Sequence, residues 1–570
     1  MKYKWNIRES DTQKTATLAQ LRNIPQVIAA VLLNRGLESP DVIDKFFNPR
    51  IEDLYDPFLM TDMDKAVDRL TLAFKNDEKI AIFGDYDVDG TTATTLLYLF
   101  LHNLKLDTLF YIPDREKEGY GLSRKGINTA IKAGCSLVIT CDSGISGIEE
   151  IDYANAHDVD VIVTDHHEPG ETLPRAMAIL DPKRGDDSYP FKELCGAGVA
   201  FKLLQGFSIR NHLPMEDLYK HLDLVAVGTA ADIVPILDEN RIIVSKGLEY
   251  LNDSQKMGLQ SLLEVSGFFN KRIGVVNIVF GIAPRLNAAG RLGDAINAIN
   301  LLKSEDREEA NHLAQLLDQL NRHRQSIERA TIDSAILQLN ATHDLEKDKI
   351  IILDDTSWHQ GVIGIVASKL KEIYNRPVIL ISFNDKVGKG SARSIPGFDL
   401  YAALSECADL LDSYGGHKMA AGLTISENNI QEFRFRLKKI AAGYIDDSML
   451  NPELTIDGEI LFQHVNQATI DFLRNLAPFG PGNMRPIFYS RNLTISGIPR
   501  IIGENHVKFK ACQDRIVISA IGWKQADLYE MLISNRPLDI AFVIEENEWR
   551  GLKEIQLNVK DIHFSNGNRN

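Results

Sequence analysis

Three aspartates alternate along one short stretch of the chain, Asp85, Asp87 and Asp89, and a glycine follows them. Carboxylates this close repel one another unless a cation neutralises them. A solvated acidic turn and a calcium loop are the alternatives, but an EF-hand loop lies between two helices and needs a glutamate at its twelfth position. The cluster therefore predicts a divalent-metal site.

Further candidate ligands follow other apolar runs. Asp142 and Asp232 each come after such a run, although either alone could simply cap a helix or form an ion pair. Asp165 closes another apolar run and precedes His166 and His167. Mixed carboxylate and imidazole ligands suit Mn²⁺ or Mg²⁺. Two such ions can generate hydroxide and stabilise a leaving oxygen, so we expect hydrolysis of a phosphoester or phosphoanhydride.

Buried strands must position these residues. Apolar runs at 79–83, 136–141 and 159–164 predict three strands, and helical patterns follow at 91–104 and up to 156. This alternation is typical of a parallel sheet covered by helices. The acidic loops then lie at the carboxyl ends of the strands, where open α/β sheets bind their ligands.

The rest of the chain predicts further domains. An apolar helix is expected at 222–231, and a long polar-faced helix at 305–339. A second α/β unit is expected from residue 349, with glycine-rich loops at 388–393 and 415–417. After about residue 450, short alternating strands indicate a small β-barrel of the OB type.

Bulk properties fit a large multidomain protein. The chain has 570 residues, 44% of them hydrophobic and 25% charged. We expect a cytoplasmic protein without a membrane segment, because no apolar signal region begins the chain and its five cysteines form no framework. The net charge of -16 alone would disfavour nucleic acid. Carboxylates that hold cations, and a local basic groove, weaken that objection.

Four motifs together resemble those of the DHH phosphoesterase superfamily, and residues 415–422 resemble the signature of its DHHA1 domain. The motifs are residues 85–90, 141–144, 165–167 and 230–232. Within the superfamily, residues 284–291, 394–399 and 478–483 resemble the RecJ family of bacterial single-strand-specific exonucleases. The resemblance implies an α/β fold: a parallel-sheet DHH domain and a smaller α/β DHHA1 domain joined by a long helix, plus a C-terminal β-barrel (OB-fold). The expected divisions are an N-terminal segment packing on the DHH domain (1–50), the DHH catalytic domain (51–240), a helical connector (241–340), the DHHA1 domain (341–445) and the OB-fold nucleic-acid-binding domain (446–570).

The resemblance also implies a role for each candidate ligand. Two divalent ions, Mn²⁺ or Mg²⁺, would be bridged by Asp142, and His167 would face the scissile phosphate. Pyrophosphatase-type relatives have a histidine where Phe83 stands here, so Asp85 would have to substitute for it. One ion would be held by Asp89, Asp142, His166 and Asp232, and the other by Asp87 and Asp142, with Asp85 as an additional ligand.

By the same resemblance, the substrate would be single-stranded DNA, degraded from its 5′ end to mononucleotides. Ser391 and Arg393 would bind the 5′-phosphate, with Arg115 as a further candidate, because an arginine fork suits phosphate geometry. Glycines 388 and 390 would let the phosphate approach the backbone. Arg285 and Arg291 would hold the DNA backbone unless one of them braces a helix, and Gly415, Gly416 and His417 would line a cleft between the two α/β domains.

An OB-fold would explain the extra length of the chain. Its groove residues would be His506, Lys508 and Lys510, and its stacking residues Phe479 and Trp523. As partners the family suggests a single-strand-binding protein and a helicase, in DNA recombination and repair. We expect a monomer.

Two alternative functions remain at this point. The first is a phosphoesterase of the same superfamily that acts on oligoribonucleotides, cyclic dinucleotides or polyphosphate, which would not need the chain beyond residue 450. The second is a non-catalytic single-strand-binding scaffold, against which the complete ligand set speaks.

Overall fold

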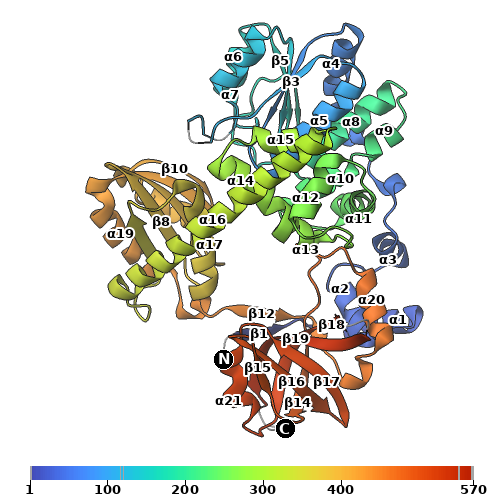
Figure 1. Ribbon diagram of the computed structural model, residues 1–570, viewed down its shortest axis with the longest axis vertical. Helices are drawn as coiled ribbons and strands as arrows, with labels where there is room; N and C mark the ends of the chain where they lie inside the picture. Colours follow the sequence, from blue (N-terminus) through green and yellow to red (C-terminus); the bar gives the residue numbers. More distant parts are fainter. Residues whose placement is uncertain (1–2, 116, 120, 550–551, 566–570) are drawn as a thin grey trace. The chain divides into compact units, whose positions relative to one another are not determined.

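The computed structural model of the chain describes residues 3–115, 117–119, 121–549 and 552–565 (Figure 1). The chain forms two compact units. Unit 1 comprises Met1–Ile43, Ser326–Ala477 and Arg485–Asn570, and unit 2 comprises Asp44–Gln325 and Pro478–Met484. Unit 2 therefore contains every candidate metal ligand.

A parallel sheet of five strands organises unit 2, in the order β3-β2-β4-β5-β6. Four of the five strands are fully buried or nearly so, as expected for a parallel sheet with helices on both faces. The three predicted strands are confirmed within one residue at each end. The strands are β2 (Ile80–Gly84), β3 (Thr108–Tyr111), β4 (Leu137–Cys141), β5 (Asp160–Thr164) and β6 (Ala178–Leu180).

Helices cover both faces of this sheet, which is drawn in blue and cyan in Figure 1, and alternate strand residues pack against different helices. Ile82 and Ile139 join a core formed with helices α4 (Met63–Lys75), α5 (Val88–Asn103) and α8 (Gly196–Arg210). Val138 and Val163 join a second core on the other face, with α6 (Arg124–Lys132) and α7 (Ile148–Asn155). Side chains of successive strand residues point to opposite faces, which is why the sheet has two cores.

The helices after the sheet are part of unit 2. Their common core also contains Val88 of α5 and Leu317 of the long helix α16 (Arg307–Thr342). Residues 241–325 thus pack with the sheet in unit 2, and α16 continues from there into unit 1. The expected connector at 241–340 is helical, and its residues up to Gln325 belong to unit 2. These helices are α10 (Leu222–Ala231), α11 (Asp238–Asn252), α12 (Met257–Val265), α13 (Val275–Asn277), the π-helix η3 (Ile278–Ile282), α14 (Ala283–Leu292) and α15 (Ile296–Lys303).

The second α/β domain expected from the sequence lies in unit 1 and has a mixed sheet in the order β10-β11-β9-β8-β7. The two glycine-rich segments predicted as loops are strands in this sheet, so that prediction is wrong. Pairing with β8 and β11 supplies β9 with a backbone partner on both sides. The elements are β7 (Ile351–Asp355), α17 (Gln360–Tyr374), β8 (Val378–Asn384), β9 (Val387–Arg393), α18 (Leu400–Ser405), β10 (Leu411–His417), β11 (Ala420–Ser426) and α19 (Ile430–Tyr444).

The C-terminal strands form a sheet that closes on itself. Strand β14 (Phe488–Ile495) pairs with both β18 (Leu538–Trp549) and β16 (His506–Gln513), which makes a barrel. The other strands are β13 (Gly458–Glu459), β15 (Arg500–Ile502), β17 (Ile516–Gly522) and β19 (Leu552–Phe564). The predicted fold class is therefore confirmed.

The N-terminal segment does not pack as expected. Strand β1 (Lys4–Ile7) pairs in parallel with β12 (Glu453–Ile456), and the Trp5 indole donates to Asp561 at 2.9 Å. Residues up to Ile43 thus belong with unit 1, because the backbone of β1 finds its partner there and not on the DHH domain. Among the described residues no single helix is long and apolar enough to cross a membrane, although the bent pair Thr12–Arg22 and Gln26–Leu33 passes that test together.

Candidate active site

Three of the site aspartates stand side by side at one edge of the unit 2 sheet. The parallel register aligns Gly84 with Cys141 and Cys141 with Thr164. The residues that follow these strand ends are Asp85, Asp142 and Asp165, each with a relative exposure of 2% or less. The expected position of the acidic loops at the carboxyl edge is confirmed.

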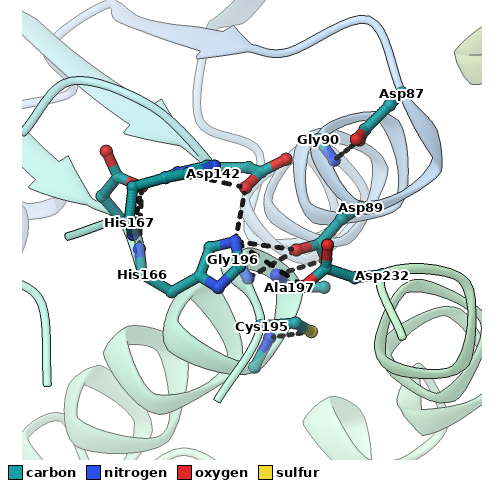
Figure 2. Close-up of polar contacts among 12 residues, drawn as sticks. Asp87, Asp89, Gly90, Asp142, His166, His167, Cys195, Gly196, Ala197 and Asp232 are labelled. Atoms are coloured by element: carbon teal, nitrogen blue, oxygen red, sulfur yellow. Dashed lines mark hydrogen bonds and ion pairs between the residues drawn. The ribbon is translucent and has the colours of Figure 1, made fainter. Parts of the chain in front are cut away.

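Two more aspartates are held by helix N-termini. Asp87 caps α5 and accepts a hydrogen bond from the Gly90 amide at 3.0 Å. Asp89, in the first turn of α5, accepts from the first amides of α8, Gly196 at 2.6 Å and Ala197 at 2.9 Å (Figure 2). Helix N-termini favour negative charge. Burial nevertheless raises the pKa of Asp89 to about 6, and the charge of Asp87 adds to this effect.

His166 lies at the centre of a group of carboxylates (Figure 2). Its Nε2 atom is 3.0 Å from Oδ1 of Asp142, 3.7 Å from Oδ2 of Asp232 and 3.8 Å from Oδ2 of Asp89. Burial lowers the pKa of His166 to about 3, so the ring is neutral and can act as a metal ligand. One imidazole nitrogen and three carboxylates surrounding one point match the ligand chemistry of a divalent transition ion.

A second group shares one of these carboxylates. Ligand atoms of Asp85, Asp87 and Asp142 lie within 4.8 Å of one another, as do those of Asp89, His166 and Asp232. Asp142, which is 3.0 Å from His166, thus connects the two groups. The structure brings together every residue predicted to hold a metal.

The electrostatics of these groups favour a bound cation. Burial raises the pKa of Asp85 and of Asp142 well above the usual value, and neighbouring aspartates raise both further. Burial and the charges of Asp89 and Asp87 raise the pKa of Asp232 to about 8. Within the described part of the chain, Oδ1 of Asp85 and Oδ2 of Asp232 are buried without a hydrogen-bond partner. Coordination of a metal ion would give these two buried oxygens the partner that they lack.

The second histidine is oriented by the aspartate that precedes the pair. Nδ1 of His167 donates to Oδ1 of Asp165 at 2.7 Å, and Oδ2 of Asp165 accepts from the Ile145 amide at 2.9 Å. Burial opposes protonation of His167, but the hydrogen bond and the charge of Asp165 outweigh it and raise its pKa to about 9. His167 is therefore a cationic donor beside the carboxylates.

Sequence reasoning missed three residues that shape this edge. A Cβ atom on Gly196 would lie 2.6 Å from the Cβ of Asp142, and one on Gly228 would lie 2.9 Å from Oδ1 of Asp89. Asp181, which follows β6, is fully buried, and burial raises its pKa to about 7. Its position after the apolar run 178–180 was an available signal.

Two of the predicted phosphate-binding arginines lie near the acidic turn. The guanidinium of Arg115 is 5.1 Å from the centroid of the Tyr86 ring. Burial, together with the charges of Arg115 and Arg324, lowers the pKa of Arg291 to about 10. A concentration of positive charge thus adjoins the carboxylates.

Arg285 has a different environment. Its guanidinium donates to Asp318 at 2.9 Å, to the Gly281 carbonyl at 2.7 Å and to the Val265 carbonyl at 3.3 Å. These contacts join α14 to α16 and to the end of α12. Of the two roles considered for Arg285, the structure favours the brace.

Ser391 and Arg393 lie next to each other on β9 in unit 1. Nη1 of Arg393 is 3.3 Å from Oγ of Ser391, and its Nε donates to Ser368 of α17 at 3.1 Å. A Cβ atom on Gly388 would meet Ile381 and Phe383, and one on Gly390 would meet Leu423. Apolar side chains thus fill the space on the Cβ side of these glycines, and their expected role in admitting a phosphate stays a prediction.

Gly415, Gly416 and His417 form the exposed end of β10 in unit 1. Gly416 has a φ of +135°, and a Cβ there would lie 2.4 Å from the Ala420 carbonyl oxygen, so the hairpin requires glycine. Their position in a cleft stays a prediction. Among the OB candidates, Trp523 is 52% exposed beside His506, whereas Phe479 lies in the part of the chain that belongs to unit 2.

The fold and this acidic edge define a phosphoesterase of the DHH superfamily. The model of the DHH family, N-terminal domain, matches residues 79–229, the DHHA1 domain matches 347–443, and the RecJ OB domain matches 456–561. Together these matches cover the sheet of unit 2 and both domains of unit 1.

The relatives specify the family within that superfamily. The chain is 38% identical to the single-stranded-DNA-specific exonuclease RecJ of Bacillus subtilis over 99% of its length and 71% of that protein. It is 32% identical to the Escherichia coli protein of the same name, over 100% of this chain and 98% of that one. The chain belongs to the RecJ family.

Solved structures agree. The crystal structure of RecJ in complex with Mn²⁺ from Thermus thermophilus superposes with a TM-score of 0.85 at 30% identity, covering 99% of this chain and 80% of that one. A crystal structure of exonuclease RecJ bound to manganese covers 68% of this chain and 96% of its own, with a TM-score of 0.60 and 38% identity.

Proposed function

We propose that this protein hydrolyses single-stranded DNA from its 5′ end to 5′-mononucleotides, with two divalent ions, Mn²⁺ or Mg²⁺, as cofactors. The observation that carries the proposal is the convergence of Asp89, Asp142 and Asp232 on Nε2 of His166, at 3.0 to 3.8 Å, in a chain of the RecJ family. Unneutralised carboxylates at this density have no structural advantage, whereas they suit a metal centre.

Two of the groups of candidate ligand atoms support a ligand assignment. Asp89, Asp142, His166 and Asp232 would hold one ion, and Asp87 and Asp142, with Asp85, the other. Two ions held in this way supply an activated water and stabilise the charge on the leaving oxygen. The carboxylates would fix the positions of the ions, since Asp89 is itself held by two amides of α8.

His167 would contact the scissile phosphate. The hydrogen bond from its Nδ1 to Asp165 sets the orientation of the ring and keeps it protonated. A cationic donor stabilises the negative charge that grows on the phosphoryl oxygens in the transition state. Asp165 is thus a positioning residue and not a metal ligand.

Substrate selection would involve both units. Arg115 and Arg291 would hold the strand beside the acidic turn, and Ser391 and Arg393 would bind the 5′-phosphate. Gly415, Gly416 and His417 would also contact the strand, and the barrel at 456–561 would add further binding to it. We further propose a cytoplasmic monomer that works in DNA repair and recombination with a single-strand-binding protein and a helicase.

A substrate panel tests the activity. The protein is incubated with Mn²⁺ and a 5′-phosphorylated single strand, the matching duplex, a dinucleotide or polyphosphate, and the products are resolved. We expect mononucleotides from the single strand. Preferential cleavage of the dinucleotide or polyphosphate would instead identify a small-substrate phosphoesterase, and retardation of DNA without cleavage would identify a binding scaffold.

A charge variant tests the phosphate site separately. Arg393→Gln should reduce the ratio of kcat/KM for 5′-phosphorylated over 5′-hydroxyl strands by roughly tenfold or more, the loss of a charge-assisted pair. Arg436→Gln is the control, because Arg436 pairs with Asp409 on the surface of the same domain. An unchanged ratio in Arg393→Gln would remove Arg393 from the site.

A further inference from the structure

The segment Pro478–Met484 packs with a different unit from the sequence on either side of it. The OB-domain match spans residues 456–561, yet Pro478–Met484 packs with unit 2, while Ala477 and Arg485 on either side belong to unit 1. The segment is held as a tight turn by hydrogen bonds between the backbones of Gly480 and Asn483. We call Pro478–Met484 the strap.

The strap contacts the turn that carries Asp232. The Ile236 amide donates to the Pro481 carbonyl at 2.8 Å. A Cβ atom on Gly480 would lie 2.5 Å from Cγ1 of the fully buried Ile236, and one on Gly482 would lie 2.8 Å from Cδ1 of Leu237. Only glycine lets the strap come this close to the turn.

That turn contains a strained residue next to the metal ligand. Ile233 has a φ of +65° and is 63% exposed. A β-branched residue rarely adopts this conformation, which is strained and persists only when the surroundings impose it. The exposed Ile233 side chain has little packing that could hold its backbone in this conformation. The backbone must therefore be held by its neighbours in the chain, and Ile236 is the first fully buried residue after it.

A second path leads from the turn to another ligand. Nδ2 of Asn240 donates to the carbonyls of Pro235 at 3.0 Å and Glu193 at 2.5 Å. Glu193 is three residues before Gly196, whose amide holds Asp89. The Pro478 carbonyl accepts from the side chains of Asn483 and Arg241, which fixes the near end of the strap on α11.

We propose that the strap is a positioning element for the metal centre, which holds the Asp232 turn, and through Asn240 the Asp89 site, in the geometry that binds the cation. The proposal rests on the metal role of Asp232 put forward above. The strap, although part of the C-terminal sequence, thus has a function in the DHH domain. The cation site at His166 is incomplete without this segment, which lies some 250 residues beyond Asp232.

The test is Gly480→Ala, whose methyl group must displace Ile236. Mn²⁺ affinity, measured by calorimetry on the whole protein, should fall by roughly 10- to 100-fold, the usual effect of disturbing groups behind metal ligands. Gly185→Ala is the matched control, since a Cβ on Gly185 meets nothing within 4 Å, and it should bind Mn²⁺ normally. Unchanged Mn²⁺ affinity in Gly480→Ala would overturn the proposal.

Two further variants separate the possible causes. If the added methyl acts through Ile236, the effect of Gly480→Ala on Mn²⁺ affinity should be at least several-fold smaller in an Ile236→Ala background, and full additivity would contradict this route. Loss of near-ultraviolet circular dichroism in Gly480→Ala would show general unfolding and would also count against a positioning role. Asp232→Asn tests the metal role itself. If Asp232→Asn binds Mn²⁺ normally, the ligand assignment is wrong. If Asp232→Asn binds Mn²⁺ weakly but Gly480→Ala binds it normally, the strap proposal alone is wrong.

Discussion

Unit 2 buries acidic groups in two places that are opposite in electrostatic character. Glu239 is fully buried, and its Oε1 accepts from the Lys202 ammonium at 3.0 Å and the Tyr55 amide at 2.9 Å. Its Oε2 accepts from the Tyr189 hydroxyl at 2.6 Å. The chain itself thus supplies a counter-charge and a donor for each oxygen.

Of the carboxylates around His166, Asp89 and Asp142 are buried to a similar degree and Asp232 less so, and they face mainly other carboxylates. Burial and this mutual repulsion raise the pKa values of Asp85, Asp89, Asp142 and Asp232. A buried charge with matched partners can serve a structural role alone. Buried charges of one sign instead require a bound counter-ion, which the protein chain does not supply. The difference distinguishes the active site from the core without any reference to relatives.

Asp142→Asn should show the largest effect, because this carboxylate is shared by both ligand groups. We expect hydrolysis of single-stranded DNA to fall by roughly a thousandfold, about 4 kcal/mol of activation free energy. The metal-free variant should melt no lower than the wild type, since the substitution removes one of several repelling charges. Activity assays and metal-free melting curves measure the two effects. Near-normal turnover would refute the bridging role.

Glu239→Gln should have the opposite profile. Because Lys202 would remain buried without its counter-charge, the free energy of unfolding should fall by about 3–5 kcal/mol, a decrease in melting temperature of roughly 10 °C. Thermal melting of the metal-free protein measures this change. Glu216→Gln, at an exposed carboxylate, is the control. If Glu239→Gln melted like Asp142→Asn, the contrast between the two regions would be wrong.

The centre of the site could be predicted from the sequence because its signals are local. Each of Asp85, Asp142 and Asp165 directly follows an apolar run, and a parallel sheet brings such strand ends together whatever the loop lengths. The positions of the metal ligands followed from strand recognition, and their roles from the resemblance. The helix at Leu222–Ala231 was predicted at its observed bounds for a similar reason, a continuous apolar run before Asp232.

The failures concern pairings between distant segments. Residues 388–393 look like a glycine-rich loop, and only the neighbouring strands β8 and β11 make them a strand. Strand β1 finds its partner some 450 residues away, and the strap likewise contacts a turn far from it in the sequence. Local patterns carry no signal for such contacts, which depend on tertiary packing.

The smallest predicted effect is on the pH dependence of metal-free stability. Burial raises the pKa of Asp232 to about 8, above its ordinary value of 3.8, so its contribution to stability is complete below about pH 4 and is lost as pH rises through 8. His167, with its pKa raised to about 9, loses its contribution in the same direction. His166, whose pKa is lowered to about 3, acts in the opposite direction, but only below about pH 6.5.

The informative window therefore lies between about pH 7 and about pH 9. There the metal-free protein should lose about 1 kcal/mol from Asp232, or roughly 2–4 °C in melting temperature. Asp232→Asn should make this slope shallower and leave only the part that His167 contributes, whereas Glu216→Gln should leave the slope unchanged. Saturating Mn²⁺ should reverse its sign for the wild type, because metal binding requires the deprotonated carboxylates and gains as they form. A slope that is the same with and without Mn²⁺ would mean that these carboxylates are not the groups that bind the ion.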